Sequence, residues 1–184
     1  MASNNVNLGI GLASGMFYTA PAGTALPDYP TDSTGLAAFT EAGAVTADGI
    51  TWATGKDSDP LRNWAKEVER LIASDEGGTV QAPLMYTDKA TLETIFGAGN
   101  VIETAATANH GKLISVDVAP GVSASPMAFL FIMKDGDDTI MLGTSKGIVR
   151  EVDDISFSST EAITWNATIE AASWTFMKDD GQTV

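Results

Sequence analysis

The sequence predicts a mainly β protein, an antiparallel β-sandwich or barrel with one flanking α-helix. Thr, Val and Ile are plentiful, and 18 Gly and 7 Pro interrupt the chain at short intervals. About nine short segments alternate or run apolar as strands do, whereas a single segment combines helical spacing with caps. The 184 residues fit one domain. We expect a flexible, Gly-rich N-terminal arm at 1–15 and one β-sandwich domain at 16–184.

The first part of the domain is predicted to consist of short strands separated by turns. Gly, Pro, Asp and Ser stand at the points where the apolar patterns stop, which is the usual chemistry of turns. In order along the chain, we expect a strand at 16–18, one helical turn at 36–39, a strand at 45–52 with a turn at 48–49, and a loop at 55–60.

The segment after this loop carries two patterns. Apolar residues from Trp64 to Ile72 follow the spacing of one helix face, which slightly favours a helix. Val68 and Ile72 with Arg70 between them also permit a strand. The pattern of the residues therefore leaves helix and strand open.

The second part of the domain holds the clearest helix and most of the strands. Asp88 can cap a helix over 88–96, in which Leu92, Ile95 and Phe96 form one apolar face before glycines end it. Strands are expected at 79–86 (broken by a proline), 113–118, 128–133 (buried on both faces), 139–142, 147–152, 155–158, 163–170 and 174–177, with a hairpin turn at 135–137.

The charge balance and residue counts exclude several classes of protein. The chain has 24 acidic and 10 basic residues, a formal net charge of −14, one His and no Cys. Without Cys there are no disulfides or thiolate zinc sites, and an acidic chain lacks the basic face that grips DNA phosphates. The longest apolar run, 127–133, is shorter than the ~20 residues of a membrane helix. No Lys or Arg precedes Lys56, so we expect no secretory signal and synthesis in a cytoplasm.

No segment carries the pattern of a catalytic or metal site. His110 lies in a predicted turn without a partner nearby in the sequence, and is interpreted as a surface residue. Residues 135–138 resemble the start of a calcium loop, but Lys146 stands where the closing carboxylate should be. The acidic pairs 153–154 and 179–180 place neighbouring side chains on opposite faces of a strand, which does not make a dyad. We therefore predict a protein that is not an enzyme and needs no cofactor.

The basic residues are concentrated around Trp64. Residues 56–70 hold four of the ten basic residues. From Asp135 to Val184 there are ten acidic residues and only three basic ones. A segment of mixed charge that carries a Trp can dock on an acidic surface of an identical neighbour. The alternative is that Trp64 belongs to the core and that the charges are ordinary solvated side chains.

Three stretches, in this order and spacing, resemble the major tail protein that builds the tube of long, non-contractile phage tails. The first is 15–27, followed by 36–39. The second is 47–51, followed by 57–59 and the segment around Trp64, and the third is 87–101, where a capped helix ends in Ile95-Phe96-Gly97. The resemblance covers most of 15–101 and, more loosely, 129–170.

The resemblance implies a β-sandwich whose copies form six-subunit rings that stack into a hollow tube, with shared strands around a channel for genome DNA. It implies a strand at 67–74 and a long inter-strand loop at about 54–66 that reaches the next ring. Small glycines commonly follow the loop Trp in this family, whereas Ala65 and Lys66 follow it here. The candidate inter-ring contacts are Lys56, Asp57, Asp59, Arg62, Trp64 and Lys66, and the candidate channel or inter-subunit acids are Asp153, Asp154 and Glu161.

The implied role is that of a structural protein of the virion tail. Its partners would be copies of itself and the terminator, tape-measure and distal tail proteins, and double-stranded DNA would pass without specific binding. The acidic composition agrees with this, because an acidic wall repels phosphates. Two alternatives remain at this point: another virion component (a tail terminator or capsid decoration protein), or a monomeric β-sandwich that binds, for example, carbohydrate through Trp52, Trp64, Trp165 and Trp174.

Overall fold

The structure is a computed structural model that describes residues 17–30, 33–55, 58–73, 77–118 and 124–181, with the backbone alone at 33, 58–61 and 68–73. Strands account for 46% of the residues and helical segments for 10%, so the predicted mainly β class is confirmed. All strand pairs in the described chain are antiparallel, and none of its sheets closes into a barrel. The arm predicted at 1–15 lies outside the described residues.

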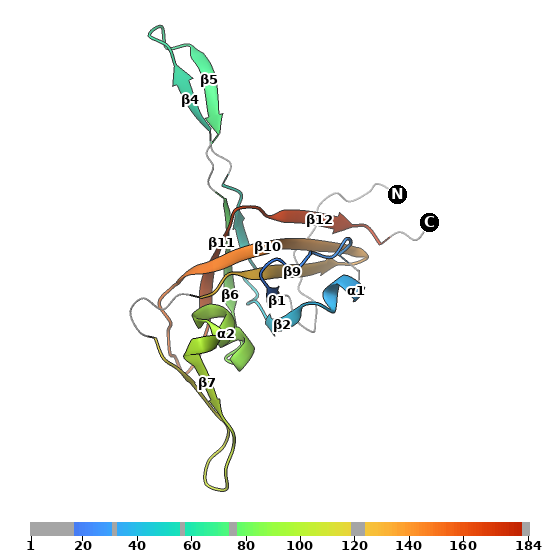
Figure 1. Ribbon diagram of the computed structural model, residues 1–184, viewed down its shortest axis with the longest axis vertical. Helices are drawn as coiled ribbons and strands as arrows, with labels where there is room; N and C mark the ends of the chain where they lie inside the picture. Colours follow the sequence, from blue (N-terminus) through green and yellow to red (C-terminus); the bar gives the residue numbers. More distant parts are fainter. Residues whose placement is uncertain (1–16, 31–32, 56–57, 74–76, 119–123, 182–184) are drawn as a thin grey trace.

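One large sheet forms the body of the fold, as Figure 1 shows. Its strands follow one another in the order β2-β1-β9-β10-β11-β6-β3, and β12 also pairs with β10. The strands are β1 (Phe17–Pro21), β2 (Thr40–Gly43), β3 (Thr51–Ala53), β6 (Gly78–Leu84), β9 (Met127–Asp135), β10 (Asp138–Val152), β11 (Trp165–Ala171) and β12 (Thr175–Asp179).

Strand β10 joins the two halves of this sheet. Its first part pairs with β12 and its second part pairs with β11. Two separate strands, 139–142 and 147–152, were expected here, and that prediction is wrong because a register shift after Thr144 keeps the chain in one strand. The Thr144 hydroxyl donates to Lys146 O (3.2 Å) and bridges the shift. A Cβ at Gly147 would lie 3.0 Å from the Phe129 ring, so glycine there allows close packing rather than ending the strand.

The core lies on both faces of β9, which confirms the prediction of a strand buried on both sides. On one face Phe129 and Phe131 stack with Phe17 of β1. On the other face Leu130 and Ile132 pack in a second cluster with Met141, Ala20 and Phe39. The helix α1 (Ser33–Leu36) ends just before Phe39, so the helical turn expected at 36–39 begins three residues earlier.

The helix α2 (Lys89–Phe96) begins and ends as its sequence predicts. The Asp88 carboxylate accepts a hydrogen bond from the Thr91 N–H at 2.9 Å. Gly97 ends the helix at φ +87°, a conformation that other residues rarely adopt, and its N–H donates to Glu93 O. Leu92 and Ile95 are buried in the same cluster as Phe129. A short 3-10 helix, η1 (Ala98–Asn100), follows directly.

Two hairpins stand apart from the large sheet, at opposite ends of the long axis of the molecule (Figure 1). One consists of β4 (Ser58–Arg62) and β5 (Val68–Ala73), and the other of β7 (Val101–Thr104) and β8 (Leu113–Val116). The strand implied at 67–74 is confirmed. The loop expected at 55–60 is partly wrong, because 58–60 belong to β4, where Pro60 is tolerated since each strand of a two-stranded sheet has an unpaired side.

Two further predictions of strands need correction, and two observed strands were not predicted. Of the strand expected at 45–52, only 51–52 lie in a strand, β3. Val45 makes a single bridge to Leu84, and the predicted turn at 48–49 separates Val45 from β3. The strand expected at 155–158 is absent from the described chain, because the pairing of β10 with β11 ends at Val152. Strands β2 and β7 were not predicted, since each is short and half polar.

Candidate assembly surfaces

The turn that joins β4 to β5 is closed by hydrogen bonds between Asn63 and the residues opposite it. The Asn63 N–H donates to Glu67 O (3.0 Å) and the Lys66 N–H donates to Asn63 O (2.9 Å). The Glu67 N–H donates to Asn63 Oδ1 (3.0 Å), and Asn63 Nδ2 donates to the Glu67 carboxylate (3.2 Å). These contacts give residues 63–67 a defined shape although they lie at the tip of a thin hairpin.

Lys66 has a left-handed backbone, with φ at +64°. Hairpin turns of this length usually place Gly at such a position, because a side chain there is crowded against the following carbonyl. The guanidinium of Arg62 donates from Nη1 to Lys66 O at 2.9 Å and so holds this conformation. Lys66 is thus held in a backbone conformation that glycine adopts more readily than other residues.

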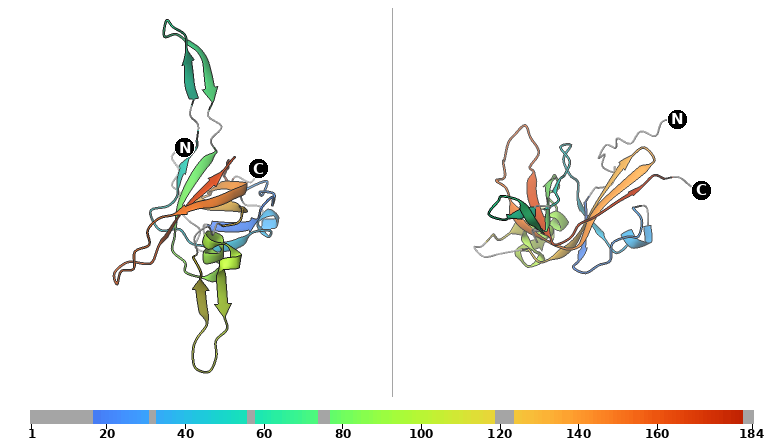
Figure 2. Two further views of the ribbon diagram at one scale, coloured as in Figure 1. Left: turned by 60° about the vertical axis from the view of Figure 1, so that its left-hand side comes forward. Right: turned by 90° about the horizontal axis from the view of Figure 1, so that it is seen from above.

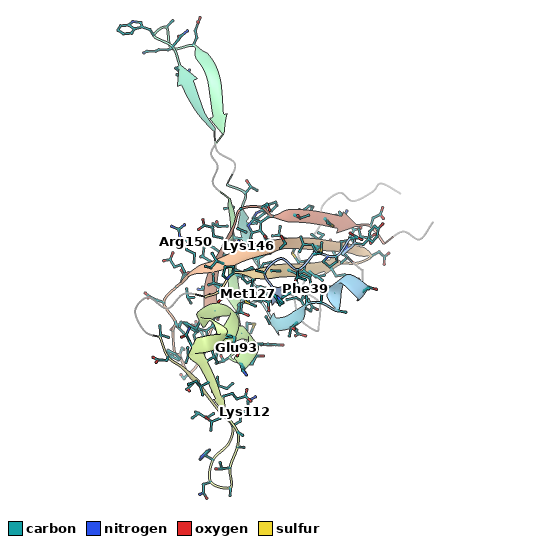
Figure 3. The ribbon with its side chains drawn as sticks, viewed as in Figure 1. Phe39, Glu93, Lys112, Met127, Lys146 and Arg150 are labelled. Carbon is teal, nitrogen blue, oxygen red and sulfur yellow. The ribbon has the colours of Figure 1, made fainter. Side chains whose placement is uncertain are left out.

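Trp64 is fully exposed, at 103% of its reference area, so the alternative that places it in the core is wrong. The side chains of the turn extend away from the body of the fold (Figure 3). An aromatic side chain of this size buries about 150–250 Å² when covered, which is worth roughly 4–6 kcal/mol at ~25 cal/mol per Å². The tip therefore carries a large apolar group that this copy of the chain leaves in water.

The structure brings together three of the six predicted contact residues. Arg62, Trp64 and Lys66 lie at the tip and are all exposed. Asp59 lies on β4, opposite Ile72 in the register, away from the turn. Lys56 and Asp57 lie outside the described residues.

The predicted acidic residues lie on the connection between β10 and β11. Asp153, Asp154 and Glu161 are all exposed, and the Asp153 N–H donates to Asn166 O (3.0 Å), which ties the start of the connection to β11. Phe157, in the middle of this connection, is 76% exposed and was not predicted as a functional residue. The sequence feature that could have indicated Phe157 is a single aromatic residue among serines.

A family model described as phage tail tube protein matches residues 1–179. The chain belongs to the phage tail tube protein family. The match runs along nearly the whole chain and confirms the resemblance found in its sequence. No curated protein sequence matches the chain. Membership gives the protein a structural role in the virion tail, in assembly with other tail subunits, and implies that it is not an enzyme.

The other tryptophans of this tail tube protein have structural partners within the fold. Trp165 is buried and donates from Nε1 to Thr87 Oγ1 at 3.2 Å. Trp174 donates to Gly78 O at 2.8 Å, and Trp52 stacks on Phe176 with ring centroids 6.5 Å apart. The four tryptophans therefore do not form one binding surface, and Trp64 is the one presented outward on a projecting element.

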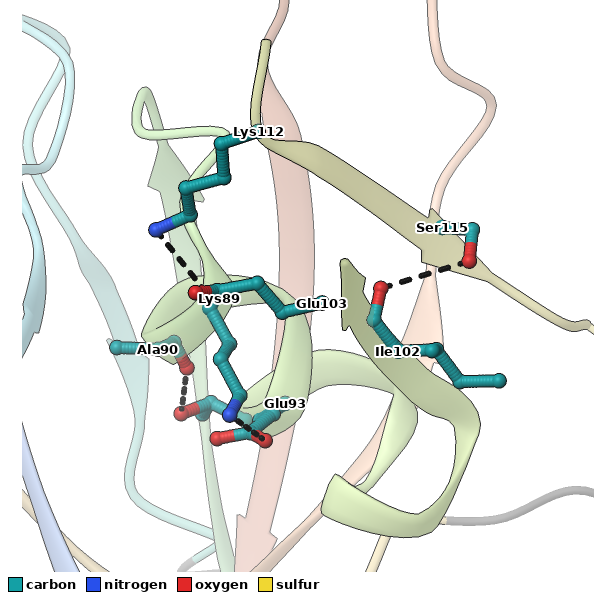
Figure 4. A network of polar contacts seen from close by, with 8 residues as sticks. Lys89, Ala90, Glu93, Ile102, Glu103, Lys112 and Ser115 are labelled. Atoms are coloured by element: carbon teal, nitrogen blue, oxygen red, sulfur yellow. Dashed lines mark hydrogen bonds and ion pairs between the residues drawn. The ribbon is translucent and has the colours of Figure 1, made fainter. Parts of the chain in front are cut away.

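The second hairpin of the tail tube protein is anchored to α2. Val101 at its root is buried, and Ile114 and Val116 pack against the core. Beyond the root, Lys112 and Glu103 form an ion pair at 3.0 Å across the strands, and Ser115 donates weakly to Ile102 O at 3.4 Å (Figure 4).

His110 lies exposed in the connection of this hairpin, where its carbonyl accepts from the Thr107 N–H at 2.9 Å, as expected of a turn residue. Within the described ranges, no group of three or more His, Asp and Glu side chains is placed to hold a metal ion. No helix of that part of the chain has the length and apolar character needed to cross a membrane.

Proposed function

We propose that this tail tube protein assembles as six-subunit rings that stack head to tail into a hollow tube, whose acidic channel lets genome DNA pass. The observation that carries the proposal is the fully exposed Trp64 on a hydrogen-bonded turn at the tip of the β4–β5 hairpin. A two-stranded hairpin is marginally stable by itself, so one that projects with an apolar tip gains stability when a neighbour covers it.

The shape of the subunit supports head-to-tail stacking. The two hairpins point in opposite directions along the long axis (Figure 1) and expose different side chains. When one end of a protein binds the different opposite end of its neighbour, the contact repeats without closing and produces an open filament. Six hairpins on each ring would act together, so a modest contact at each one suffices to hold two rings.

Strand edges of the large sheet support lateral contacts within a ring. In the described chain β3 and β2 end the sheet, and β12 pairs on one side with β10. Unpaired edges invite pairing with another chain, and closing them into a shared inner barrel removes this hazard. In this assembly residues 16–184 would form the unit that closes the barrel, and residues 1–15 would add as an arm to a neighbour's surface.

The net charge supports a channel that does not retain DNA. DNA carries one charge per about 1.7 Å of its axis, so a basic wall would bind it tightly and an acidic wall repels it. Each copy brings a formal charge of −14 to the assembly. The terminator, tape-measure and distal tail proteins would contact only the ends or the bore of such a tube.

Electron microscopy of the purified full chain tests this proposal. We expect rings and tubes with an axial hole. Trp64→Ala should raise the protein concentration needed for tubes by about 100-fold or more, because a burial worth roughly 4 kcal/mol is lost. Trp64→Phe, which keeps an aromatic anchor, should restore most of the assembly. Protein that stays monomeric at all concentrations would contradict the proposal, and rings that never stack would favour a terminator role.

A further inference from the structure

We infer that the tip of the β4–β5 hairpin docks on the connection between β10 and β11 of a copy in the neighbouring ring. In this contact Trp64 lies against Phe157, and Arg62 and Lys66 face Asp153 and Asp154. The inference rests on the proposed stacking of rings, and it names the surface that receives the hairpin.

The receiving surface is strongly acidic. Residues 151–161 contain four acids and no Lys or Arg, and all four acids are exposed. The nearest base, Arg150 (labelled in Figure 3), is already paired with Glu170 at 3.0 Å on the neighbouring strand. This stretch therefore presents negative charge that lacks a compensating base of its own.

The tip has the opposite charge. Arg62 and Lys66 are exposed at the turn, and the one acid between residues 62 and 67, Glu67, accepts a hydrogen bond from Asn63. On a protein with a charge of −14, a basic tip is repelled by few surfaces and attracted to many. Charge alone therefore does not select one acidic surface, and an apolar contact is needed to make the binding of the tip specific.

Exposed aromatic side chains meet this requirement on both surfaces. Trp64 stands at the centre of the basic tip and Phe157 at the centre of the acidic connection, and each is largely or fully exposed. Aromatic anchors at the centre of an interface with a charged rim are the usual arrangement of residues that carry binding energy.

The two surfaces also lie on opposite sides of the subunit. The connection between β10 and β11 leaves the body on the side away from the β4–β5 tip, as the left view of Figure 2 shows. A copy displaced along the long axis brings its connection toward the tip of the copy before it. This is the relation that stacked rings require, and one subunit cannot make this contact with itself.

A second acidic surface provides the control. Asp28, Asp179 and Asp180 line a groove with Tyr29, which is also exposed. One side of this groove is formed by the end of β12, the strand that pairs with β10 (Figure 1), and Lys178 there pairs with Asp138 at 2.9 Å. A tip attracted by charge alone would accept this groove as readily as the connection.

A charge exchange in the full-length protein tests the contact, with tube formation measured by sedimentation and electron microscopy. Lys66→Glu is the first variant, since it keeps the Arg62 hydrogen bond to the turn, and Asp153→Lys with Asp154→Lys is the second. Each should reduce the tube fraction by about tenfold or more, and their combination should restore at least half of it. Lys66→Glu combined with Asp28→Lys and Asp180→Lys should show no restoration.

Disulfide trapping gives a second measurement that leaves both aromatics in place, because the natural chain has no Cys. Ala65→Cys with Ser156→Cys should give ladders of cross-linked chains when tubes are oxidised, since a disulfide needs Cα atoms within about 7 Å. Ala65→Cys with Asp28→Cys should stay uncross-linked.

The outcomes separate this inference from the proposed function. If the natural protein forms tubes but the charge exchange fails to restore assembly and the 65–156 pair gives no ladder, the docking surface is wrong and the stacked tube stands. If the natural protein forms no tubes, both fail.

Discussion

The two projecting hairpins differ in how they are attached to the fold. The β7–β8 hairpin is rooted in the core: Val101 is buried and Val116 packs in the same cluster as Leu92 of α2. The β4–β5 hairpin pairs only within itself in the described chain. One hairpin is therefore part of the folded unit, whereas the other is held in shape mainly by its own ladder and turn.

This difference separates folding from assembly. Buried apolar side chains stabilise a subunit whether or not neighbours are present, and a projecting hairpin contributes little to that stability. The exposed side chain of Trp64 contributes stabilising free energy only when another chain covers it and removes it from water. We expect changes in β4–β5 to alter the tube and changes at the root of β7–β8 to alter the subunit.

The largest effect is expected from removing the β4–β5 hairpin. Replacing residues 58–73 by a short Gly–Ser linker should abolish tubes, because the inter-ring anchor is gone. The thermal unfolding midpoint of the subunit should change by less than about 2 °C, since little of the core is touched. Electron microscopy measures the loss of tubes, and circular dichroism measures the thermal unfolding midpoint. A subunit that melts much earlier would show that the hairpin supports the fold.

A smaller effect is expected at the root of the other hairpin. Val101→Ala should lower the free energy of unfolding by about 2 kcal/mol, because it removes two buried methyl groups and leaves a cavity. Ile102→Ala, next to it on the exposed side of the same strand, should change it by less than about 0.5 kcal/mol. Denaturant unfolding of unassembled subunits measures both. Equal losses would mean that β7–β8 is not anchored as described.

Elements whose stabilising contacts are local were predicted from the sequence. The cap of α2 depends on Asp88 and Thr91, three residues apart, and the doubly buried β9 is a continuous apolar run. Where the outcome depends on distant residues, prediction was incomplete. The strands expected at 139–142 and 147–152 are one strand because of a register shift against β9, which the sequence of β10 alone does not reveal. Residues 155–158 alternate like a strand, but the pairing of β10 with β11 ends before them.

The candidate site shows the same limit. The spacing of Trp64, Val68 and Ile72 fits a helix, and the strand followed only from the resemblance to a family. The sequence alone did not decide whether Trp64 lies in the core or on the surface, because the exposure of a side chain is a property of the whole fold. The contact residues Arg62 and Lys66 were proposed from charge, whereas Phe157 was overlooked because the exposure of its side chain follows from the fold.

The smallest effect concerns the shape of the tip. Lys66→Gly should relieve the left-handed strain at φ +64°, worth about 1 kcal/mol, and should slow hydrogen exchange of the Asn63 and Glu67 amides by roughly fivefold. Lys66→Ala, which loses the charge but keeps the strain, is the matched control and should leave that exchange unchanged. If tubes of the glycine variant are weaker than natural tubes although its turn is firmer, the lysine is retained for its charge at the contact rather than for the conformation of the turn. If both variants assemble like the natural protein, the charge of Lys66 does not contribute to the contact between rings, which then depends on Trp64 and Arg62.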